Sequence, residues 1–401
     1  MNVLEVYKSL AKRLLAHLDA KTVDSAPDIY RQPTAVYSDK ELFEGEKNTI
    51  FKDEPYFVGF SSELPEPGTY FTWDDAGVPV LLVRDNEGKM RAFLNACTHR
   101  SARIKEGSGK LRAMSCPYHG WGFDLKGKLR SIYEESSFGN VDKELYNLVE
   151  LPSHEKYGMI FVGLHAGVKV DIDTIFGDLA PVFASWDLGS AQLVKEHSWH
   201  IDTNWKLALD TFCEGYHFGI LHKELLAFQY GNVSAFDTFG PNGRNHRLAF
   251  PNHTIDRLRN IPEDQWDDQV FQDFQLVHYI YPNTSILVSL NSIEFFQLYP
   301  GKEVGTHHTR YRCFWRGQGE SLGAEKSWSR GTPEDHANLI IKIVDTEDYW
   351  ISMNVMRNLK ANIIKFSTFG KNEPALQNMH KAFAIGAGRS PEQYQLPATQ
   401  A

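Results

Sequence analysis

Residues 97–119, CTHRSARIKEGSGKLRAMSCPYH, contain two short motifs that each pair a cysteine with a histidine. The first motif is C-x-H, at Cys97 and His99, and the second is C-x-x-H, at Cys116 and His119. Each motif follows a run of residues typical of a β-strand and lies next to glycines that favour tight turns. Two thiolates and two imidazoles that converge from two loops suit either a zinc ion or an iron–sulfur cluster. The spacing therefore predicts a metal-binding module and leaves both alternatives open.

The character of the chain differs on the two sides of residue 170. Short β-rich runs such as VPVLLVRD, RAFLNAC and GMIFVGL, separated by PEPG, DNEG and LKGK turns, predict an all-β domain over residues 51–170. Residues 171–401 combine both kinds of pattern, which predicts an α+β domain with an antiparallel sheet and long helices. The helical stretches lie near 203–218 and 334–359, and the strand-like stretches lie near 275–299 and 305–316.

Residues 1–50 are expected to form a helical segment that packs on this larger α+β domain. Six apolar residues recur at helical spacing near the start of the chain, namely Val3, Leu4, Tyr7, Leu10, Leu14 and Leu18. Basic residues interrupt this stretch, so it lacks the apolar core of a signal peptide. An amphipathic helix on the protein's own surface is the preferred interpretation, and a helix lying on a membrane surface is the alternative.

The composition excludes several classes of protein. The chain has 401 residues, of which 42% are hydrophobic, and its formal net charge is −9. Without a block of basic residues it is a poor candidate for binding nucleic acid. Four cysteines in a chain of this length do not make a disulfide scaffold. No run approaches the roughly 18 apolar residues of a membrane-spanning helix, so a cytoplasmic protein is expected.

A second candidate site lies in residues 204–222, NWKLALDTFCEGYHFGILH. Glu214 and His217 are three residues apart and would share one face of a helix. His217 and His222 are five apart, about 140° of rotation on a regular helix, so both reach one ion only if the helix ends or bulges between them. Gly219 would permit such a break. Two imidazoles and one carboxylate form the facial triad of non-haem Fe(II) oxygenases, although two histidines near a helix end are also typical of capping or core positions.

The third ligand should be a distant carboxylate. Residues 336–359, HANLIIKIVDTEDYWISMNVMRNL, are predicted to be helical, with an apolar stripe formed by Ile340, Val344, Ile351 and Val355. Asp348 falls on that stripe, where a carboxylate is costly unless it is paired or binds a metal. Asp345 has Lys342 one turn away and is the second choice. The alternative for Asp348 is an ordinary carboxylate on the helix surface.

Four motifs together resemble those of Rieske non-haem iron oxygenase large subunits. CTHRSARI and CPYHGWGFDLKGKL are similar to the family's two cluster loops, C-x-H-R-G and C-P-Y-H-G-W. Residues 204–222 resemble its N-W-K…E-N-x-x-E-x-Y-H…H segment, and Glu347–Asp348 its late E-D pair. The resemblance covers about residues 50 to 380. The departures are Ser101 for Gly, Asp210 for Glu and Thr211 for Asn.

The resemblance implies two iron centres and a fold. Cys97 and Cys116 would hold one iron of a [2Fe–2S] cluster, and His99 and His119 the other, as in a Rieske centre. His217, His222 and Asp348 would hold a mononuclear Fe(II). The implied fold is α+β, with an all-β Rieske [2Fe–2S] domain and a helix-grip (START-like) antiparallel-sheet catalytic domain.

The resemblance also implies an activity and partners. Electrons would come from NADH through a separate reductase, with or without a ferredoxin, because the chain has no convincing G-x-G-x-x-G fingerprint of its own. The Fe(II) site would use O₂ to hydroxylate or dihydroxylate a hydrophobic, aromatic substrate, with Thr284–Pro300 as one wall of the pocket. Glu214 would link this site to a cluster histidine of a neighbouring subunit, in a homotrimer or an α3β3 assembly with a small subunit. Asp210 is a further catalytic candidate that could steady the iron-binding segment or hydrogen-bond His217.

The sequence is also compatible with other functions. Within the same family the chain could be a monooxygenase or demethylase that acts on a quaternary amine or another non-aromatic substrate. From other classes, it could be an electron-transfer protein with a non-catalytic second domain, or a zinc-stabilised binding protein with a START-like cavity.

Overall fold

The computed structural model describes residues 2–226, 229–316 and 331–396, and the chain forms two compact units. We call Phe51–Ile172 with Trp186–Gly189 the small unit. The large unit consists of Met1–Ile50, Asp173–Ser185 and Ser190–Ala401. The sequence predicts domain boundaries after residues 50 and 170. The structure differs from that prediction mainly because the chain returns to the small unit for four residues, Trp186–Gly189.

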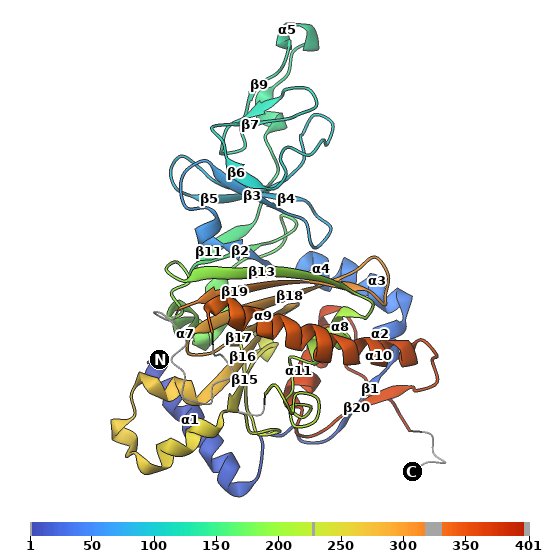
Figure 1. The fold of residues 1–401 in the computed structure, drawn as a ribbon. Helices are drawn as coiled ribbons and strands as arrows, with labels where there is room; N and C mark the ends of the chain where they lie inside the picture. Colours follow the sequence, from blue (N-terminus) through green and yellow to red (C-terminus); the bar gives the residue numbers. More distant parts are fainter. Residues whose placement is uncertain (1, 227–228, 317–330, 397–401) are drawn as a thin grey trace. The chain divides into compact units, whose positions relative to one another are not determined.

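The small unit is built from short antiparallel strands (Figure 1). One sheet has five strands in the order β10-β5-β4-β3-β6, and two further sheets have three strands each, β11-β12-β2 and β7-β8-β9. The strands are β2 (Tyr56–Phe60), β3 (Thr69–Trp73), β4 (Val80–Arg84), β5 (Met90–Leu94), β6 (Ser108–Lys110), β7 (Met114–Ser115), β8 (Gly122–Phe123), β9 (Leu129–Ser131), β10 (Glu150–Leu151), β11 (Ser153–Lys156) and β12 (Met159–Val162). Short helical turns are η1 (Ser61–Glu63), α5 (Glu135–Phe138) and η2 (Lys143–Tyr146), and α4 (Ile50–Asp53) lies at the border of the unit.

Two turns in this unit are fixed in the same way by an aspartate. The Asp85 carboxylate accepts backbone N–H bonds across the DNEG turn and the Nε–H of Arg91 at 2.7 Å, while Gly88 has a φ of +80°. Asp124 repeats the pattern and accepts the Nε–H of Arg130 at 2.8 Å. An aspartate that bonds the turn backbone and a glycine with positive φ are the usual requirements of a tight turn.

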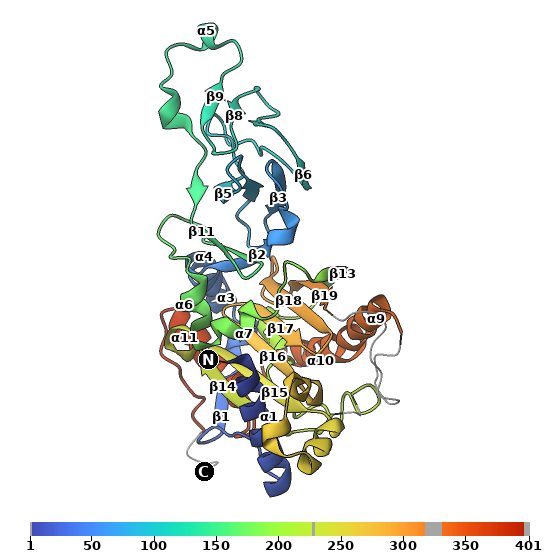
Figure 2. The same ribbon diagram turned by 90° about the vertical axis from the view of Figure 1, so that its left-hand side faces the viewer.

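The large unit is organised around one antiparallel sheet of seven strands, in the order β13-β19-β18-β17-β16-β15-β14. Figure 2 shows strands β16 to β19 side by side. The strands are β13 (Gln192–Ile201), β14 (Ala235–Phe239), β15 (Asn245–Pro251), β16 (Phe274–Ile280), β17 (Thr284–Val288), β18 (Ser292–Pro300) and β19 (His307–Trp315), with the separate pair β1 (Tyr30–Pro33) and β20 (Phe366–Phe369). The strand-like stretches expected near 275–299 and 305–316 correspond to β16 to β19.

The helices of the large unit include several that contact this sheet. The helices are α1 (Val3–Ala20), α2 (Ala35–Ser38), α3 (Lys40–Asn48), α6 (Ile172–Phe176), α7 (Ala180–Ala184), α8 (Trp205–Asp210), α9 (Pro333–Ile343), α10 (Tyr349–Leu359) and α11 (Pro374–Gly386), with 3₁₀ turns η3 (Gly177–Leu179), η4 (Pro241–Gly243), η5 (His253–Asn260), η6 (Glu263–Gln265) and η7 (Asp268–Asp273). Helix α1 contacts β14 and β15 and buries Tyr7, Leu10 and Leu14, so its apolar face covers the protein's own sheet. Helix α8 lies against β18, and α11 against β15.

Two of the expected helices differ from the structure. The helix expected over 203–218 ends at Asp210, because the chain continues as a series of isolated turns. Within these turns Gly215 lies close to β15, since a Cβ on it would lie 2.5 Å from Cε1 of Phe250. The helix expected over 334–359 is continuous, but a π-helix at Val344–Asp348 separates α9 from α10.

No helix in the described part of the chain is both long and apolar enough to cross a lipid bilayer.

Candidate metal centres

The two cysteine–histidine motifs of the small unit form loops with the same backbone hydrogen bonds. Ser101 N–H donates to the carbonyl of Cys97 at 2.8 Å, and Gly120 N–H donates to the carbonyl of Cys116 at 3.0 Å. Each loop turns at a residue with positive φ, +59° at Ser101 and +69° at Gly120. The two loops are therefore structural repeats, and Ser101 occupies the position at which the family pattern has glycine.

The side chains of these loops are arranged in two pairs. Cys97 and Cys116 are buried, and the pKa of Cys97 is raised mainly by burial and also by the neighbouring Cys116 thiol. The rings of His99 and His119 lie with centroids 4.7 Å apart. The Nδ1 atoms of both histidines are buried and have no hydrogen-bond partner among the described residues. Because buried polar atoms are almost always bonded, these two nitrogens are suited to a ligand that the protein itself does not supply.

The pairing distinguishes between zinc and a cluster. A tetrahedral zinc ion, with bonds of about 2.0–2.3 Å, would bring its donor atoms to within about 4 Å of one another. Among the described residues, only one set of three or more possible ligands has all its donor atoms within 4.8 Å of one another, and that set lies in the large unit. The four residues of the small unit therefore do not converge on a single ion. Two thiols on one side and two imidazoles on the other match a Rieske cluster, in which each pair holds a different iron.

The group that does converge is His217, His222 and Asp348, in the large unit. The two Nε2 atoms are 3.0 Å apart. Oδ1 of Asp348 lies 3.3 Å from Nε2 of His222 and 3.6 Å from Nε2 of His217. Three ligands on one face of an octahedral ion, with bonds of about 2.1 Å, would be separated by about 3 Å. The three side chains thus fit a facial triad for one ion.

The outer ring nitrogens of both histidines are held by carboxylates. Nδ1 of His222 donates to Oε2 of Glu347 at 2.6 Å, and Nδ1 of His217 makes a short contact with Glu214. The other Glu214 oxygen accepts the backbone N–H of His217 at 3.1 Å. Such outer carboxylates fix the tautomer and the orientation of metal-binding imidazoles. The sequence had indicated that Glu214 holds an iron-binding histidine. It had not indicated this role for Glu347, which was considered only as the neighbour of Asp348.

Charge in this site favours a cation. Burial lowers the pKa of His217, but the hydrogen bonds and charges of Asp348 and Glu214 outweigh burial and raise it to about 10. Burial raises the pKa of Asp348, but the two imidazoles bring it below its usual range. Three carboxylates therefore surround two imidazoles. A bound divalent cation would balance the negative charge of the carboxylates, a role that protons on the imidazoles would otherwise fill.

The π-helix decides which carboxylate faces the histidines. Asp348 ends the π-helix and is buried, whereas Asp345, within the same turn, is exposed. Consecutive residues Glu347 and Asp348 contact opposite nitrogens of the same imidazole, that of His222. A π-turn is a common feature of functional sites because it re-aims side chains within a helix. Of the two aspartates considered as third ligand, the structure brings only Asp348 to the site.

His217 and His222 each begin an isolated turn after α8. Their carbonyls accept the backbone N–H of Leu221 and Leu226, respectively, both at 2.8 Å. The break between the histidines therefore does not depend on Gly219, whose φ is not positive. The helix that was expected to carry Glu214 and His217, and to end or bulge before His222, ends earlier, at Asp210.

Asp210 lies apart from the histidine pair. Its carboxylate accepts the hydroxyl of Tyr37 at 2.7 Å and Nε2–H of His380 at 2.8 Å, and its described contacts include no hydrogen bond to His217. It thus fixes the end of α8 against two other segments. Of its two expected roles, the geometry fits positioning of the iron-binding segment.

A cavity of about 60 Å³ opens beside the triad. Its wall is mostly apolar and contains three phenylalanines, Phe212, Phe218 and Phe250. The expected wall, Thr284–Pro300, contributes only Leu287; the other sheet residues come from β15 and β16. Gln275 of β16 is the one side-chain amide among the lining residues, and its Oε1 accepts a hydrogen bond from Gln229 at 2.9 Å.

Known proteins match both units. Residues 54–147 match the Rieske [2Fe-2S] domain, and residues 188–384 match the catalytic domain of the ring hydroxylating alpha subunit. The chain is 31% identical to the glycine betaine monooxygenase oxygenase subunit of Chromohalobacter salexigens, over 51% of this chain and 47% of that protein. It is 30% identical to the benzene 1,2-dioxygenase subunit alpha of Pseudomonas putida, over 46% of this chain and 42% of that one. These matches span about half the length of the curated relatives.

Solved structures match over nearly the whole chain. A quaternary ammonium Rieske monooxygenase in complex with L-carnitine has a TM-score of 0.72 at 19% identity, and the match covers 94% of this chain and 97% of that one. Naphthalene 1,2-dioxygenase from Rhodococcus sp., bound to indole, has a TM-score of 0.68 at 18% identity, over 96% and 99%. At these identities the likeness concerns the fold.

The positive φ of Ser101 gives a prediction on stability. Ser101→Gly should raise the free energy of unfolding of the small unit by about 0.5 kcal/mol, because glycine adopts this conformation without steric cost but gains entropy when unfolded. Gly120→Ser should lower it by about 1 kcal/mol. A Cβ at Gly120 would meet only Cβ of Tyr133 at 3.5 Å, an ordinary contact, so the backbone is the cause tested. Unfolding by denaturant, followed through the visible absorbance of the cluster, measures both changes in the free energy of unfolding. A decrease for Ser101→Gly or an increase for Gly120→Ser would contradict the structural equivalence of the two loops.

The contact of Glu347 with His222 gives a second prediction. Glu347→Gln should weaken Fe(II) affinity by roughly 10- to 100-fold, because the imidazole loses the carboxylate that orients its Nδ1–H. The matched control is Asp345→Asn, which removes a charge from an exposed residue of the same π-helix and should leave affinity unchanged. Equilibrium titration of metal-depleted protein with Fe(II) measures both, and equal affinities in the two variants would refute the role of Glu347.

Proposed function

We propose that this chain, which belongs to the Rieske non-haem iron oxygenases, is a terminal oxygenase component that uses O₂ and electrons from NADH to hydroxylate or dihydroxylate a hydrophobic, ring-containing substrate. One observation carries the proposal: the set of His217, His222 and Asp348 adjoins an apolar cavity, in a chain that also has a Rieske domain. An electron carrier would need only the small unit. It would not need buried metal ligands beside a cavity in a second unit.

Each group of residues has a distinct task in this proposal. When bound, the two iron centres supply single-electron storage and O₂ activation. His217, His222 and Asp348 would hold the ion, and the cavity beside them would receive the substrate. Glu214 and Glu347 hold the imidazoles with Nε2 directed inward, so little reorganisation is needed when the metal changes its other ligands. The apolar wall excludes water and orients the substrate.

The cavity lining supports a neutral, hydrophobic substrate. Apart from the metal ligands, no lining residue in the described part of the chain is charged. A zwitterionic substrate would lose its hydration there without a counter-ion, which is unfavourable. The second candidate is a quaternary amine, because relatives named for glycine betaine and carnitine oxidation are among the matches and three phenylalanine rings could face a cation.

We further propose that Glu214 joins two subunits. Its carboxylate already bonds the Nδ1 side of His217 and is only partly buried. A cluster histidine of a neighbouring subunit could complete the contact, so that electrons pass between chains rather than within one. A homotrimer or an α3β3 assembly, a reductase partner with or without a ferredoxin, and a cytoplasmic location belong to this proposal.

Metal content and O₂ uptake test the activity. The purified protein should contain roughly three irons and two labile sulfides per chain. With a surrogate reductase and NADH, it should consume O₂ and oxidise naphthalene, with glycine betaine as the alternative substrate. Asp348→Ala should retain the cluster but lose one iron and product formation, while Asp345→Ala should behave as the unaltered protein. A colourless zinc protein, or equal product from Asp348→Ala, would overturn the proposal.

A substitution at Glu214 tests the bridge between subunits. Glu214→Gln should keep the iron content but reduce product formation per NADH by more than about tenfold, because the amide cannot serve as acceptor for both imidazoles. The matched control is Glu224→Gln, an exposed residue of the same segment. Rapid mixing of the reduced protein with substrate and O₂, followed by cluster absorbance, should show slow oxidation of the cluster. Near-normal turnover in Glu214→Gln would remove Glu214 from the electron path.

A further inference from the structure

The large unit contains a second cavity that shares no lining residue with the one beside the triad. Its volume is about 430 Å³, within the range of small-molecule sites. Residues from six separate parts of the chain line it, from β1, α2, α3, α8 and α11 and from the segment after α11. Neither the iron centres nor the proposed reaction requires such a space.

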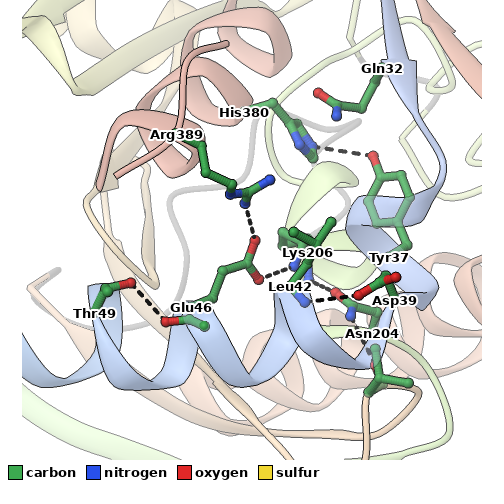
Figure 3. A network of polar contacts seen from close by, with 12 residues as sticks. Gln32, Tyr37, Asp39, Leu42, Glu46, Thr49, Asn204, Lys206, His380 and Arg389 are labelled. Atoms are coloured by element: carbon green, nitrogen blue, oxygen red, sulfur yellow. Dashed lines mark hydrogen bonds and ion pairs between the residues drawn. The ribbon is translucent and has the colours of Figure 1, made fainter. Parts of the chain in front are cut away.

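A buried ion cluster forms one wall of this cavity (Figure 3). Lys206 and Glu46 are both almost fully buried and form a short ion pair. Nη2 of Arg389 also donates to Glu46, at 3.1 Å. One carboxylate therefore faces two cations. Burying an ion pair costs considerable desolvation energy, so a pair at the wall of a cavity indicates a role beyond stability.

Arg389 has further capacity for binding. A guanidinium carries five N–H donors, and the structure gives Arg389 one hydrogen bond, to Glu46. Its side chain is 31% exposed, so the remaining donors are accessible. Planar guanidinium groups bind carboxylates through two parallel hydrogen bonds.

Two further polar side chains face the cavity with unused groups. His380 is 4% exposed, and both of its hydrogen bonds, to Asp210 and Tyr37, use Nε2. Gln32 is also 4% exposed, and its described hydrogen bond is a long one of 3.5 Å from Nε2 to the Pro33 carbonyl. Figure 3 shows Gln32, His380 and Arg389 around the same opening as Glu46. The described contacts therefore leave Nδ1 of His380 and Oε1 of Gln32 free to accept a hydrogen bond from a ligand.

The rest of the wall is mostly apolar and includes Tyr30, Leu42 and Phe383. Ser390 and Glu392, after α11, are its remaining polar residues. A ligand that fits would have an aromatic or short aliphatic body. It would also need an anionic group at one end and a hydrogen-bond donor at the other.

We propose that this cavity binds a small hydroxy-carboxylic acid with an apolar body. Its carboxylate pairs with Arg389 beside the Lys206–Glu46 pair, its hydroxyl donates to Nδ1 of His380 or Oε1 of Gln32, and its body packs on Tyr30, Leu42 and Phe383. The site lies at one end of α8, and the other end of α8 leads into the segment that carries His217. The proposed ligand would therefore bind outside the iron site.

The probe for this site is 4-hydroxybenzoate, and the measurement is isothermal titration calorimetry on the holoprotein. One molecule should bind per chain, and its uncharged analogue 4-hydroxybenzamide should bind at least about tenfold more weakly, as expected for the loss of a charged hydrogen bond. Arg389→Gln should weaken binding of the acid by a similar factor. Its matched control, Arg357→Gln, alters an exposed arginine of α10 and should leave binding unchanged.

A second pair of variants tests the location without removing a charge. Ala384→Phe adds a ring to the cavity wall and should abolish binding, whereas Ile385→Phe, at the adjacent exposed position of α11, should not. Absence of binding to the unaltered protein would overturn the proposal. So would binding that Arg389→Gln and Ala384→Phe both leave intact, because the probe would then occupy another place, such as the iron site. Since the measurement requires no turnover, its result is independent of the oxygenase proposal.

Discussion

A buried carboxylate next to two imidazoles is the constraint on which the large unit depends. Asp348 is 5% exposed on an apolar helix stripe, and its charge is tolerated there because the Nε2 atoms of His217 and His222 face it. The arrangement requires a π-helix on one side and a non-helical segment on the other. It also requires outer carboxylates, because an imidazole with an unbonded Nδ1 could rotate away from the ion. The need to pair the buried Asp348 carboxylate with two imidazoles thus accounts for irregular backbone in two distant segments, the π-helix and the turns after α8.

The two metal centres use opposite nitrogens of histidine. In the large unit Nε2 is directed inward and Nδ1 is held by Glu214 or Glu347. In the small unit the Nδ1 atoms of His99 and His119 are the buried nitrogens without a partner. The difference follows from reach, since Nδ1 is closer to the backbone and suits a cluster that lies against two tight loops, whereas Nε2 suits an ion that lies farther from the chain.

Helix α8 is the structural link between the two cavities of the large unit. Lys206 of α8 lines the larger cavity, and Thr211, directly after α8, lines the one beside the triad. Asp210 fixes the helix end through Tyr37 and His380, and His380 also lines the larger cavity. Polar contacts therefore run without interruption from that cavity to the start of the iron-binding segment, although none of them touches the iron ligands.

The sequence alone determined the ligand types and the fold class. The spacing of Cys97, His99, Cys116 and His119 and the strand-like runs of β16 to β19 are local features, because a motif or a strand is encoded in adjacent residues. The tertiary structure decided the end of α8 at Asp210, the π-helix that selects Asp348 over Asp345, and the contact of Glu347 with His222. It also brought together Gln32, Glu46, Lys206, His380 and Arg389, which no sequence pattern connects. These features depend on contacts between distant segments, whose energies local propensity does not contain.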